Sequence, residues 1–437
     1  MRQSLDPSSQ RDRGLLRAIG PWALSASIVN VVVGAGIFAV PAALAANIGP
    51  YAPLAFLVCA IGVASVAICF AEGGSRIPTS GGAYGYVSAA FGPLTGYVAG
   101  TMLWFCNALA CGGIAAALAD VAGSLTPTPY RSIVRCLVVV GVVGGIAVIN
   151  VSGVARAARL VTAMTVLKLI PLAIFVVAGA SAIRWSNFAP IGQPSTQHLG
   201  RGLILAVFAF TGMEVSLSAS GEVVRPARSI PRALAISMLS VTGLYVSIQV
   251  IAQGILGPSL AQANASLADA MGRISPTLRW LMLAGTAASM FGWIGSDLLG
   301  TPRVLFAFAR DGLLPRALGK VHPQNQTPHV AILLYAGLAI GLALTGTFAE
   351  LAVLSTLGTA ALYIAVCAAA WRLARHGIAV AGLPLNFRWL GAAASVGIVS
   401  MLALVALASR AEVLGLVAVL ALSALAYLVQ SRIGRPS

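Results

Sequence analysis

The chain has 437 residues, of which 59% are hydrophobic and only 9% are charged. Soluble globular proteins carry about 25% charged residues, so this composition excludes an ordinary soluble protein and predicts an all-α polytopic membrane protein embedded in the lipid bilayer. The net charge of +16 could suggest nucleic-acid binding. However, the basic residues lie in short loops between apolar segments, so no nucleic acid is expected as a partner.

Twelve apolar segments are predicted to be transmembrane helices. The first follows an Arg-bearing tail and has no convincing cleavage site, so it is expected to stay in the protein as a helix rather than leave as a signal peptide. The predicted spans lie near residues 21–47, 52–76, 91–123, 132–150, 157–181, 200–222, 230–256, 278–309, 329–346, 350–374, 387–409 and 411–430.

The distribution of Lys and Arg predicts the orientation in the membrane. When the N-terminus is placed in the cytoplasm, most basic residues fall on the cytoplasmic side of the twelve spans, as the positive-inside rule requires. We therefore expect a multi-pass protein of the plasma (bacterial inner) membrane, with cytoplasmic tails at residues 1–20 and 431–437.

The first span is interrupted by Gly34-Ala35-Gly36, within an otherwise helical apolar run. Glycine costs about 1 kcal/mol inside a helix and admits backbone angles that other residues avoid. A broken helix in lipid leaves polar backbone groups that protein, water or a ligand must satisfy. Taken alone, this motif predicts either a ligand site or a close crossing of two helices.

A second interruption lies in the sixth span, where Gly212 and Glu214 follow Phe208-Ala209-Phe210-Thr211. Spans one and six are five spans apart, and the blocks 21–181 and 200–374 each hold five spans. An odd number of spans per block inserts the second copy upside down. Broken helices at matching positions of two inverted halves predict a secondary transporter with its site near the middle of the membrane.

Several short motifs, in their order along the chain, resemble the amino acid–polyamine–organocation (APC) transporter superfamily. They are Gly34-Ala35-Gly36-Ile37-Phe38 with Pro41, Ala71-Glu72-Gly73-Gly74-Ser75-Arg76-Ile77-Pro78, Ser80-Gly81-Gly82-Ala83-Tyr84, Phe210-Thr211-Gly212-Met213-Glu214, Gly221-Glu222-Val223, Pro226 with Ile230-Pro231, and Arg310-Asp311-Gly312-Leu313-Leu314-Pro315. The resemblance covers nearly the whole chain and is to permeases that work without sodium. It implies a five-plus-five inverted repeat (LeuT-like fold) with broken helices one and six, two peripheral helices at 387–430, and amino acids or related amines as substrates.

A zwitterionic amino acid needs an anion site and a cation site close together. The outer half of span one begins near Ala35-Gly36-Ile37, and the N–H groups and positive dipole end at such a helix start suit a carboxylate. The first half of span six ends near Phe208, Ala209, Phe210 and Thr211, whose carbonyls suit an ammonium group. Recognition by the backbone explains why the sequence shows no Arg or Asp clamp.

Further site positions follow from the resemblance alone. It implies that Asn107, Cys111 and Ile114 in span three face the substrate side chain, and that Phe208 packs over the substrate. Each assignment has a structural alternative: Asn107 could join two helices by hydrogen bonds, Phe208 could be plain core, and Gly212 could be a notch for helix packing.

Three charged residues are expected at membrane depth, where a charge is costly and marks a functional site. Lys168 resembles a lysine that stands where sodium-coupled relatives bind their ion, or it is a permanent strut. Glu214 resembles a glutamate proposed to sense protons, or it supports the break in span six. Asp297 departs from the family pattern, because several relatives carry a tryptophan there. It could bind a cationic side chain, pair with Lys168 or carry a proton.

The leading interpretation is a secondary amino acid transporter that works by alternating access without sodium, either coupled to protons or by exchange. A cationic amino acid or polyamine antiporter is the alternative. A membrane enzyme or a channel is less favoured, because all four histidines lie in loops or at span ends and no repeated filter or ring of charges occurs. No cofactor and no metal site are expected. The sequence leaves the oligomeric state open.

Overall fold

The computed structural model describes residues 20–34, 36–77, 82–189, 192–217, 223–310, 312–325, 327–380 and 384–433, apart from the side chains of 154–166, 307, 310 and 431–433. Parts of several predicted features lie outside the described residues: residues 1–19 of the first tail, 434–437 of the last, and Ala35, Pro78, Ser80, Gly81, Gly221, Glu222 and Asp311 of the motifs.

The described residues form α-helices joined by loops and short 3₁₀ turns. In chain order the helices are α2 Pro21–Val32, α3 Gly36–Ile48, α4 Ala52–Arg76, α5 Ala83–Phe91, α6 Pro93–Ser124, α7 Arg131–Val151, α8 Val154–Ala180, α9 Thr196–Phe210, α10 Met213–Leu217, α11 Pro226–Leu256, α12 Ser266–Gly272, α13 Pro276–Gly300, α14 Pro302–Arg310, α15 His329–Thr345, α16 Phe348–Arg375, α17 Leu390–Ala406 and α18 Arg410–Ile433.

Local signals define where several of the long helices begin. Pro93, Pro226 and Pro276 are the first residues of α6, α11 and α13. An N–H group at the first position of a helix has no intrahelical acceptor, so proline loses no hydrogen bond there, and its fixed φ is already helical. Helix α16 begins with a capping box: Thr347 Oγ1 accepts from Glu350 N at 3.3 Å, and Glu350 Oε2 accepts from Thr347 N at 3.0 Å. The sequence around each of these residues therefore explains where the helix begins.

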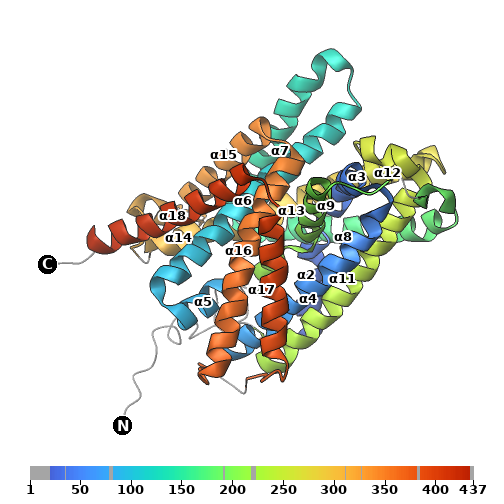
Figure 1. The fold of residues 1–437 in the computed structure, drawn as a ribbon. Helices are drawn as coiled ribbons and strands as arrows, with labels where there is room; N and C mark the ends of the chain where they lie inside the picture. Colours follow the sequence, from blue (N-terminus) through green and yellow to red (C-terminus); the bar gives the residue numbers. More distant parts are fainter. Residues whose placement is uncertain are drawn as a thin grey trace, which may run out of the picture.

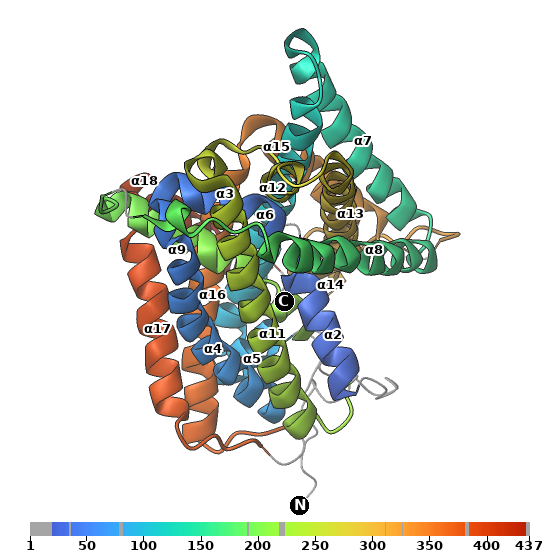
Figure 2. The same cartoon turned by 90° about the vertical axis from the view of Figure 1, so that its right-hand side faces the viewer.

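Helix α4 lies among the long helices and packs against α9, α11, α16 and α17. In both views α4, α11, α16 and α17 run side by side (Figures 1 and 2). A second group is built from α13 against α8 and from α6 against α7, α15 and α16, so α16 belongs to both groups. Helix α18 lies on the outside of α6 and α16 and is largely exposed. The interrupted helices pack on the first group, with α2 against α11 and α9 against α3, α4 and α16.

Two helical runs are interrupted at glycines. After α2, Gly34 N donates to Val32 O at 2.6 Å and closes a tight turn before α3 begins at Gly36. Between α9 and α10, Gly212 has a φ of +119°, which L side chains rarely adopt. A Cβ atom at Gly212 would also lie 3.0 Å from Val31 Cγ1 on α2. The two breaks are therefore neighbours, and the second requires glycine for both backbone and space.

By length and composition, seven stretches of the described residues could cross a membrane, which is the pattern of a polytopic membrane protein. They are Gly36–Arg76, Pro93–Ser124, Thr128–Val151, Thr196–Leu217, Pro226–Gln262, Phe348–Arg375 and Arg410–Gln430. Four more apolar helices have 10–17 residues and are too short to be counted alone: Pro21–Val32, Leu167–Ala180, His329–Thr345 and Leu390–Ala406. The number of twelve spans stays a prediction.

Candidate functional site

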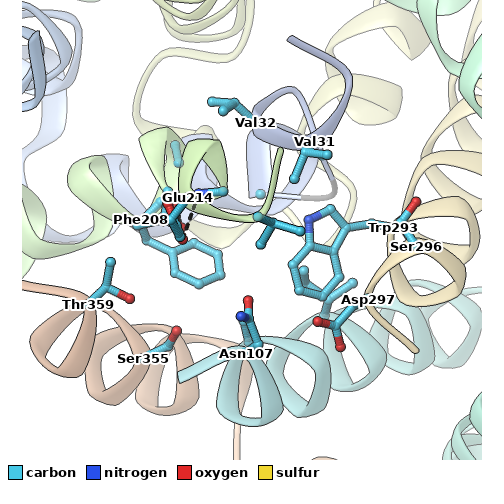
Figure 3. Close-up of a pocket in the computed structure, with 18 residues that line it drawn as sticks. Val31, Val32, Asn107, Phe208, Glu214, Trp293, Ser296, Asp297, Ser355 and Thr359 are labelled. Carbon is cyan, nitrogen blue, oxygen red and sulfur yellow. Dashed lines mark hydrogen bonds between the residues drawn. The ribbon is translucent and has the colours of Figure 1, made fainter. Parts of the chain in front are cut away.

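A small cavity lies where the two interrupted runs meet (Figure 3). Its volume is about 40 Å³, and its walls come from α2, α3, α6, α9, α10, α13 and α16 and from the two breaks. Of the residues that the sequence and the resemblance single out, the lining includes Gly34, Gly36, Asn107, Ile114, Phe208, Ala209, Thr211, Gly212, Glu214 and Asp297.

The carbonyl end of α2 is held by a lysine. Lys168 Nζ on α8 donates to Asn30 O at 2.6 Å, and Lys168 is only 4% exposed. The Asn30 carbonyl belongs to the last turn of α2, where carbonyl oxygens lack intrahelical donors and the helix carries its negative dipole end. Just beyond, Ser289 Oγ on α13 donates to Gly34 O at 3.3 Å. A side-chain donor from α8 thus caps the end of this half-helix.

A single tyrosine hydroxyl joins the two breaks. Tyr245 on α11 is fully buried, and its hydroxyl lies 2.6 Å from Val32 O and 2.9 Å from Ala209 O, to which it donates. Val32 ends α2, and Ala209 lies in the last turn of α9. Carbonyls at helix ends need partners from outside the helix, and an unmet one is costly when buried. The Tyr245 hydroxyl therefore bridges the carbonyl ends of the two interrupted helices.

Tyr245→Phe is expected to lower the free energy of unfolding by about 1–3 kcal/mol, because two buried carbonyls lose their shared donor while the ring still fills its place. Thermal unfolding of the purified protein in detergent measures this change. The matched control is Tyr130→Phe, whose tyrosine is 58% exposed and whose loss should change stability by no more than about 0.5 kcal/mol. Equal stability of the two variants would show that the Tyr245 hydroxyl does not hold the breaks.

The start of α3 faces the cavity through Gly36. A Cβ atom there would lie 3.5 Å from Phe208 Cε1 and 3.7 Å from Ala209 Cα, so the start of α3 lies beside the end of α9. The first N–H groups of a helix have no intrahelical partner, and the break thus places donors next to carbonyls. A Cβ atom on Gly34 would clash with the indole of Trp293. Gly34 fits the helix-crossing interpretation, and Gly36 fits the cavity-facing one.

Glu214 supports the break between α9 and α10. Gly212 N donates to both carboxylate oxygens at 3.1 Å, and the Tyr363 hydroxyl on α16 donates to Oε2 at 2.7 Å. An acid in the first turn of a helix is stabilised by the N–H groups and the dipole of that end. Its carboxylate also lines the cavity beside Phe208 (Figure 3). This geometry fits the supporting role, and a coupling role stays a prediction.

Asp297 on α13 lies in the cavity wall, where α13 faces α15 and α6. Thr301 Oγ1 donates to its Oδ1 at 2.6 Å, Tyr335 OH donates to its Oδ2 at 2.5 Å, and the Cys111 thiol also hydrogen-bonds to it. Among the described residues, none of the ion pairs joins Asp297 to Lys168. The salt bridge that the sequence left open is not formed, because the lysine bonds to α2 and the carboxylate is engaged by three neutral donors.

Asn107 and Phe208 approach the cavity from opposite sides (Figure 3). Asn107 Nδ2 donates to Leu103 O at 2.9 Å. This hydrogen bond lies within α6 and does not join two helices. The Phe208 ring contacts the Phe348 ring edge to face, with centroids 5.7 Å apart, so the first residue of α16 supports the aromatic wall of the cavity.

Three of the predicted substrate-binding residues, and the coupling residue Lys168, lie outside the cavity lining in the described part of the chain. Ile37 and Phe210 are fully buried in the core, where the Phe210 ring contacts the Phe56 ring edge to face at 6.0 Å. Cys111 lies behind the wall, against Asp297. The position of each side chain around its helix axis decides whether it reaches the cavity. Ala35 lies outside the described residues.

Hydroxyl groups that the sequence reasoning missed complete the wall. Ser355 and Thr359 on α16 and Ser296 on α13 line the cavity, and Ser355 Oγ donates to Cys106 O at 2.8 Å. Ser355 and Thr359 are four residues apart and therefore share a face of α16. Two hydroxyls at this spacing within an apolar span were the signal that could have revealed them.

Comparison with known proteins identifies the family. A family model described as "Amino acid permease" matches residues 19–411. The chain is 25% identical over 386 residues to the branched-chain amino acid permease BcaP of Bacillus subtilis (strain 168), covering 84% of this chain and 83% of that protein. It is 28% identical over 342 residues to the serine/threonine exchanger SteT of the same organism, covering 75% of this chain and 77% of that protein.

A mammalian relative is also similar. The chain is 29% identical over 343 residues to large neutral amino acids transporter small subunit 2 of Mus musculus, covering 73% of this chain and 63% of that protein. The family model spans both helix breaks and every residue that lines the cavity. The chain therefore belongs to the amino acid permease family of the APC superfamily, as the motifs of the sequence predicted.

Proposed function

We propose that the protein is a secondary transporter that carries amino acids across the plasma membrane by alternating access, without sodium, either coupled to protons or by exchange. The observation that carries this proposal is the cavity at the two helix breaks, where the start of α3 and the end of α9 face each other across Gly36 and Phe208. N–H groups on one side and carbonyls on the other are the pair of contacts that an α-carboxylate and an α-ammonium group require.

Two of the carbonyls predicted for the ammonium group are already engaged within the protein. Phe208 O accepts from Thr211 Oγ1 at 2.8 Å, and Ala209 O accepts from Tyr245 OH. A carbonyl oxygen has two lone pairs. Phe208 O also accepts from Thr211 N at 3.2 Å, so both of its lone pairs are engaged, whereas Ala209 O can accept a second donor. The substrate ammonium group would then bind Ala209 O, whose position Tyr245 holds.

The size of the cavity supports alternating access. Ligand pockets usually measure about 300–1,000 Å³, whereas this cavity measures about 40 Å³. An amino acid can enter only if side chains of the wall move. Phe208 and the half-buried Trp293 are the large side chains that fill the space between the breaks (Figure 3), so we expect them to move as substrate binds.

Independence from sodium is proposed from the contact between Lys168 and Asn30. The ammonium group lies 2.6 Å from a carbonyl at the end of α2, which is the type of oxygen that coordinates an alkali cation at a broken helix. A resident positive charge opposes the binding of a second cation at the same oxygen.

Replacement of Na⁺ by choline at constant pH should therefore leave uptake into proteoliposomes unchanged. The matched control is Lys168→Met, which removes the charge and leaves the Asn30 carbonyl without this donor, and which should lose uptake in both salts. Strict dependence of the unmodified protein on sodium would contradict the proposed role of the lysine.

The topology belongs to the same proposal. We infer twelve spans, with residues 21–181 and 200–374 as inverted halves and cytoplasmic N- and C-termini. Support comes from α2–α3 and α9–α10, which are interrupted at matching positions of the two blocks and meet at one cavity. Cysteine labelling from either side of the membrane, at positions in the tails and in the loops, would test the orientation.

The substrate class is tested by a binding screen. The relatives named above transport or exchange branched-chain, hydroxyl-bearing and large neutral amino acids, which supports a neutral amino acid. Asp297 in the cavity wall supports the alternative, a cationic amino acid or a polyamine. Purified protein should be screened against the twenty amino acids and the common polyamines. Binding of none of them would contradict the proposed function.

A further inference from the structure

Exposed arginine side chains gather with aromatic rings where α16 ends and α17 begins. Arg372 lies over the ring of Phe91, Arg375 over Trp371 and Arg388 over Trp389, with the guanidinium carbon 5.1, 5.6 and 5.5 Å from the ring centroids. We call these six residues the arginine–aromatic patch. They lie at the end of α5, the last turns of α16 and the segment just before α17.

The two helix ends that carry the patch are in contact. A Cβ atom on Gly391 at the start of α17 would lie 3.8 Å from Trp371 Nε1 on α16, and the ends of both helices meet at the lower edge of the molecule in both views (Figures 1 and 2). Trp371 is 48% exposed and Trp389 is 65% exposed. Tryptophans at helix ends are typical of the boundary between lipid tails and headgroups.

The patch has an excess of positive charge. Residues 371–391 contain three arginines and one histidine but no Asp or Glu. The nearest acid whose contacts reach this segment is Glu72 at the end of α4, which is buried and paired with Arg76 at 2.8 Å. The three patch arginines thus have no carboxylate in their own segment. Arg279 at the start of α13 differs, because it lies over the Trp280 ring but also pairs with Asp269 at 3.7 Å.

The segment that presents Arg388 is held rigidly by α4. Glu72 accepts from Asn386 N at 3.2 Å and from Phe387 N at 3.0 Å, and Arg76 Nη2 donates to Asn386 Oδ1 at 2.6 Å. Ser75 Oγ accepts from Leu385 N at 3.0 Å. A buried ion pair with satisfied hydrogen bonds fixes geometry even where it adds little stability. The backbone directly before Arg388 is therefore preorganised, which lowers the entropic cost of binding a ligand there.

Stacking leaves the binding edge of each guanidinium group available. A guanidinium group that lies over an aromatic ring keeps the N–H groups that point away from the ring for hydrogen bonds, and its planar fork matches two oxygens of a phosphate. The neighbouring exposed rings and Ile378 and Phe387 offer apolar surface beside the phosphate position. An anion with an attached hydrocarbon fits both features, whereas a free anion uses only the first.

We propose that the arginine–aromatic patch binds the phosphate of an anionic glycerophospholipid, with the acyl chains against Trp371 and Trp389. This site is separate from the cavity at the helix breaks and does not depend on what the protein transports. The patch lies at the end of the molecule where α2 begins and α4 ends (Figure 2).

The test is native mass spectrometry of the purified full-length protein after equilibration in micelles containing equal amounts of phosphatidylglycerol and phosphatidylcholine. The unmodified protein should retain phosphatidylglycerol over phosphatidylcholine, and Arg388→Gln should lower that ratio about fivefold, with further losses for Arg372→Gln and Arg375→Gln. Arg388→Lys should give an intermediate ratio, because it keeps the charge but loses the planar fork. Arg279→Gln, the matched control at the opposite end, should leave the ratio unchanged.

The possible outcomes separate the alternatives. Arg372→Gln and Arg375→Gln are added to Arg388→Gln in one triple variant. If this triple variant does not fold, the ratio for Arg388→Gln alone, measured with its thermal unfolding, decides the question. An unchanged ratio in that variant, or an equal fall in Arg279→Gln, would overturn the proposal. Release of phosphatidylglycerol by inorganic phosphate at physiological concentration would also overturn it, since it would show a site for free anions.

Discussion

Gly36→Val is expected to abolish substrate binding while the protein still inserts and folds. A Cβ atom at Gly36 would make ordinary contacts with Phe208 and Ala209. The two γ-carbons of valine would then extend into the cavity or into the Phe208 ring. Overpacking of this kind costs about 1–3 kcal/mol, and it would fall on the N–H groups at the start of α3 that we propose for the carboxylate. We expect uptake into proteoliposomes to fall below about a tenth of the unmodified level.

Gly36→Ala is the matched control for this prediction. Its Cβ atom would lie 3.5 Å or more from every neighbouring atom, so it fits without displacing Phe208. Uptake by the alanine variant should stay within a few-fold of the unmodified protein, and both variants should elute as single species in size-exclusion chromatography. Unchanged uptake by Gly36→Val would remove the start of α3 as the carboxylate site.

The helix breaks follow from local chemistry, and this is why the sequence predicted their positions. Glycine at 212 takes a φ of +119°, which strains any other residue whatever the surrounding packing. The family could also be predicted from the sequence, because its motifs depend on order and spacing along the chain. The number of membrane spans was harder to predict, because α15 and α17 are shorter than a typical membrane-crossing helix.

The side chains around the cavity were harder to predict. Phe210 lies two residues from Phe208, yet Phe208 lines the cavity and Phe210 packs on Phe56. On a helix, two residues turn the side chain by about 200°, so a site assigned to consecutive residues includes some that face away. The rotation of α9 depends on its contacts with α3, α4 and α16. These contacts join segments far apart in the chain.

The partners of the buried charges were also out of reach of the sequence. Three tyrosine hydroxyls donate hydrogen bonds around the cavity. That of Tyr245 donates to backbone carbonyl groups, that of Tyr335 to Asp297 and that of Tyr363 to Glu214. Tyrosine within an apolar span is compatible with ordinary core packing, because its ring is apolar and only its hydroxyl needs a partner. The sequence therefore identified the carboxylates and the lysine, whose burial is costly, but not the neutral donors that compensate for it.

Those donors change the expectation for Asp297. A carboxylate accepts at about four positions, and Thr301, Tyr335 and Cys111 occupy three of them. With the salt bridge to Lys168 absent, two functional readings remain: attraction of a second ammonium group on the substrate, and transfer of a proton. A carboxylate that is already held by neutral donors gains less from a substrate cation. The donors themselves stabilise the ionised form, but the burial of Asp297 away from water penalises that form, and this burial favours the proton. We therefore expect uptake to respond to an inward proton gradient through this residue.

Asp297→Asn should remove the response of uptake to an imposed proton gradient and lower the free energy of unfolding by about 1.5–3 kcal/mol, because the amide N–H₂ cannot accept from Tyr335 or Thr301. Tyr335→Phe is the matched control, since it removes one donor but keeps the carboxylate, and it should lose stability while uptake still responds to the gradient. Selective loss of lysine, ornithine or diamine binding in Asp297→Asn, with the gradient response retained, would instead assign the carboxylate to cation recognition. Unmodified affinity, specificity, gradient response and stability in the asparagine variant would exclude both roles, and Asp297 would then be only a part of the cavity wall.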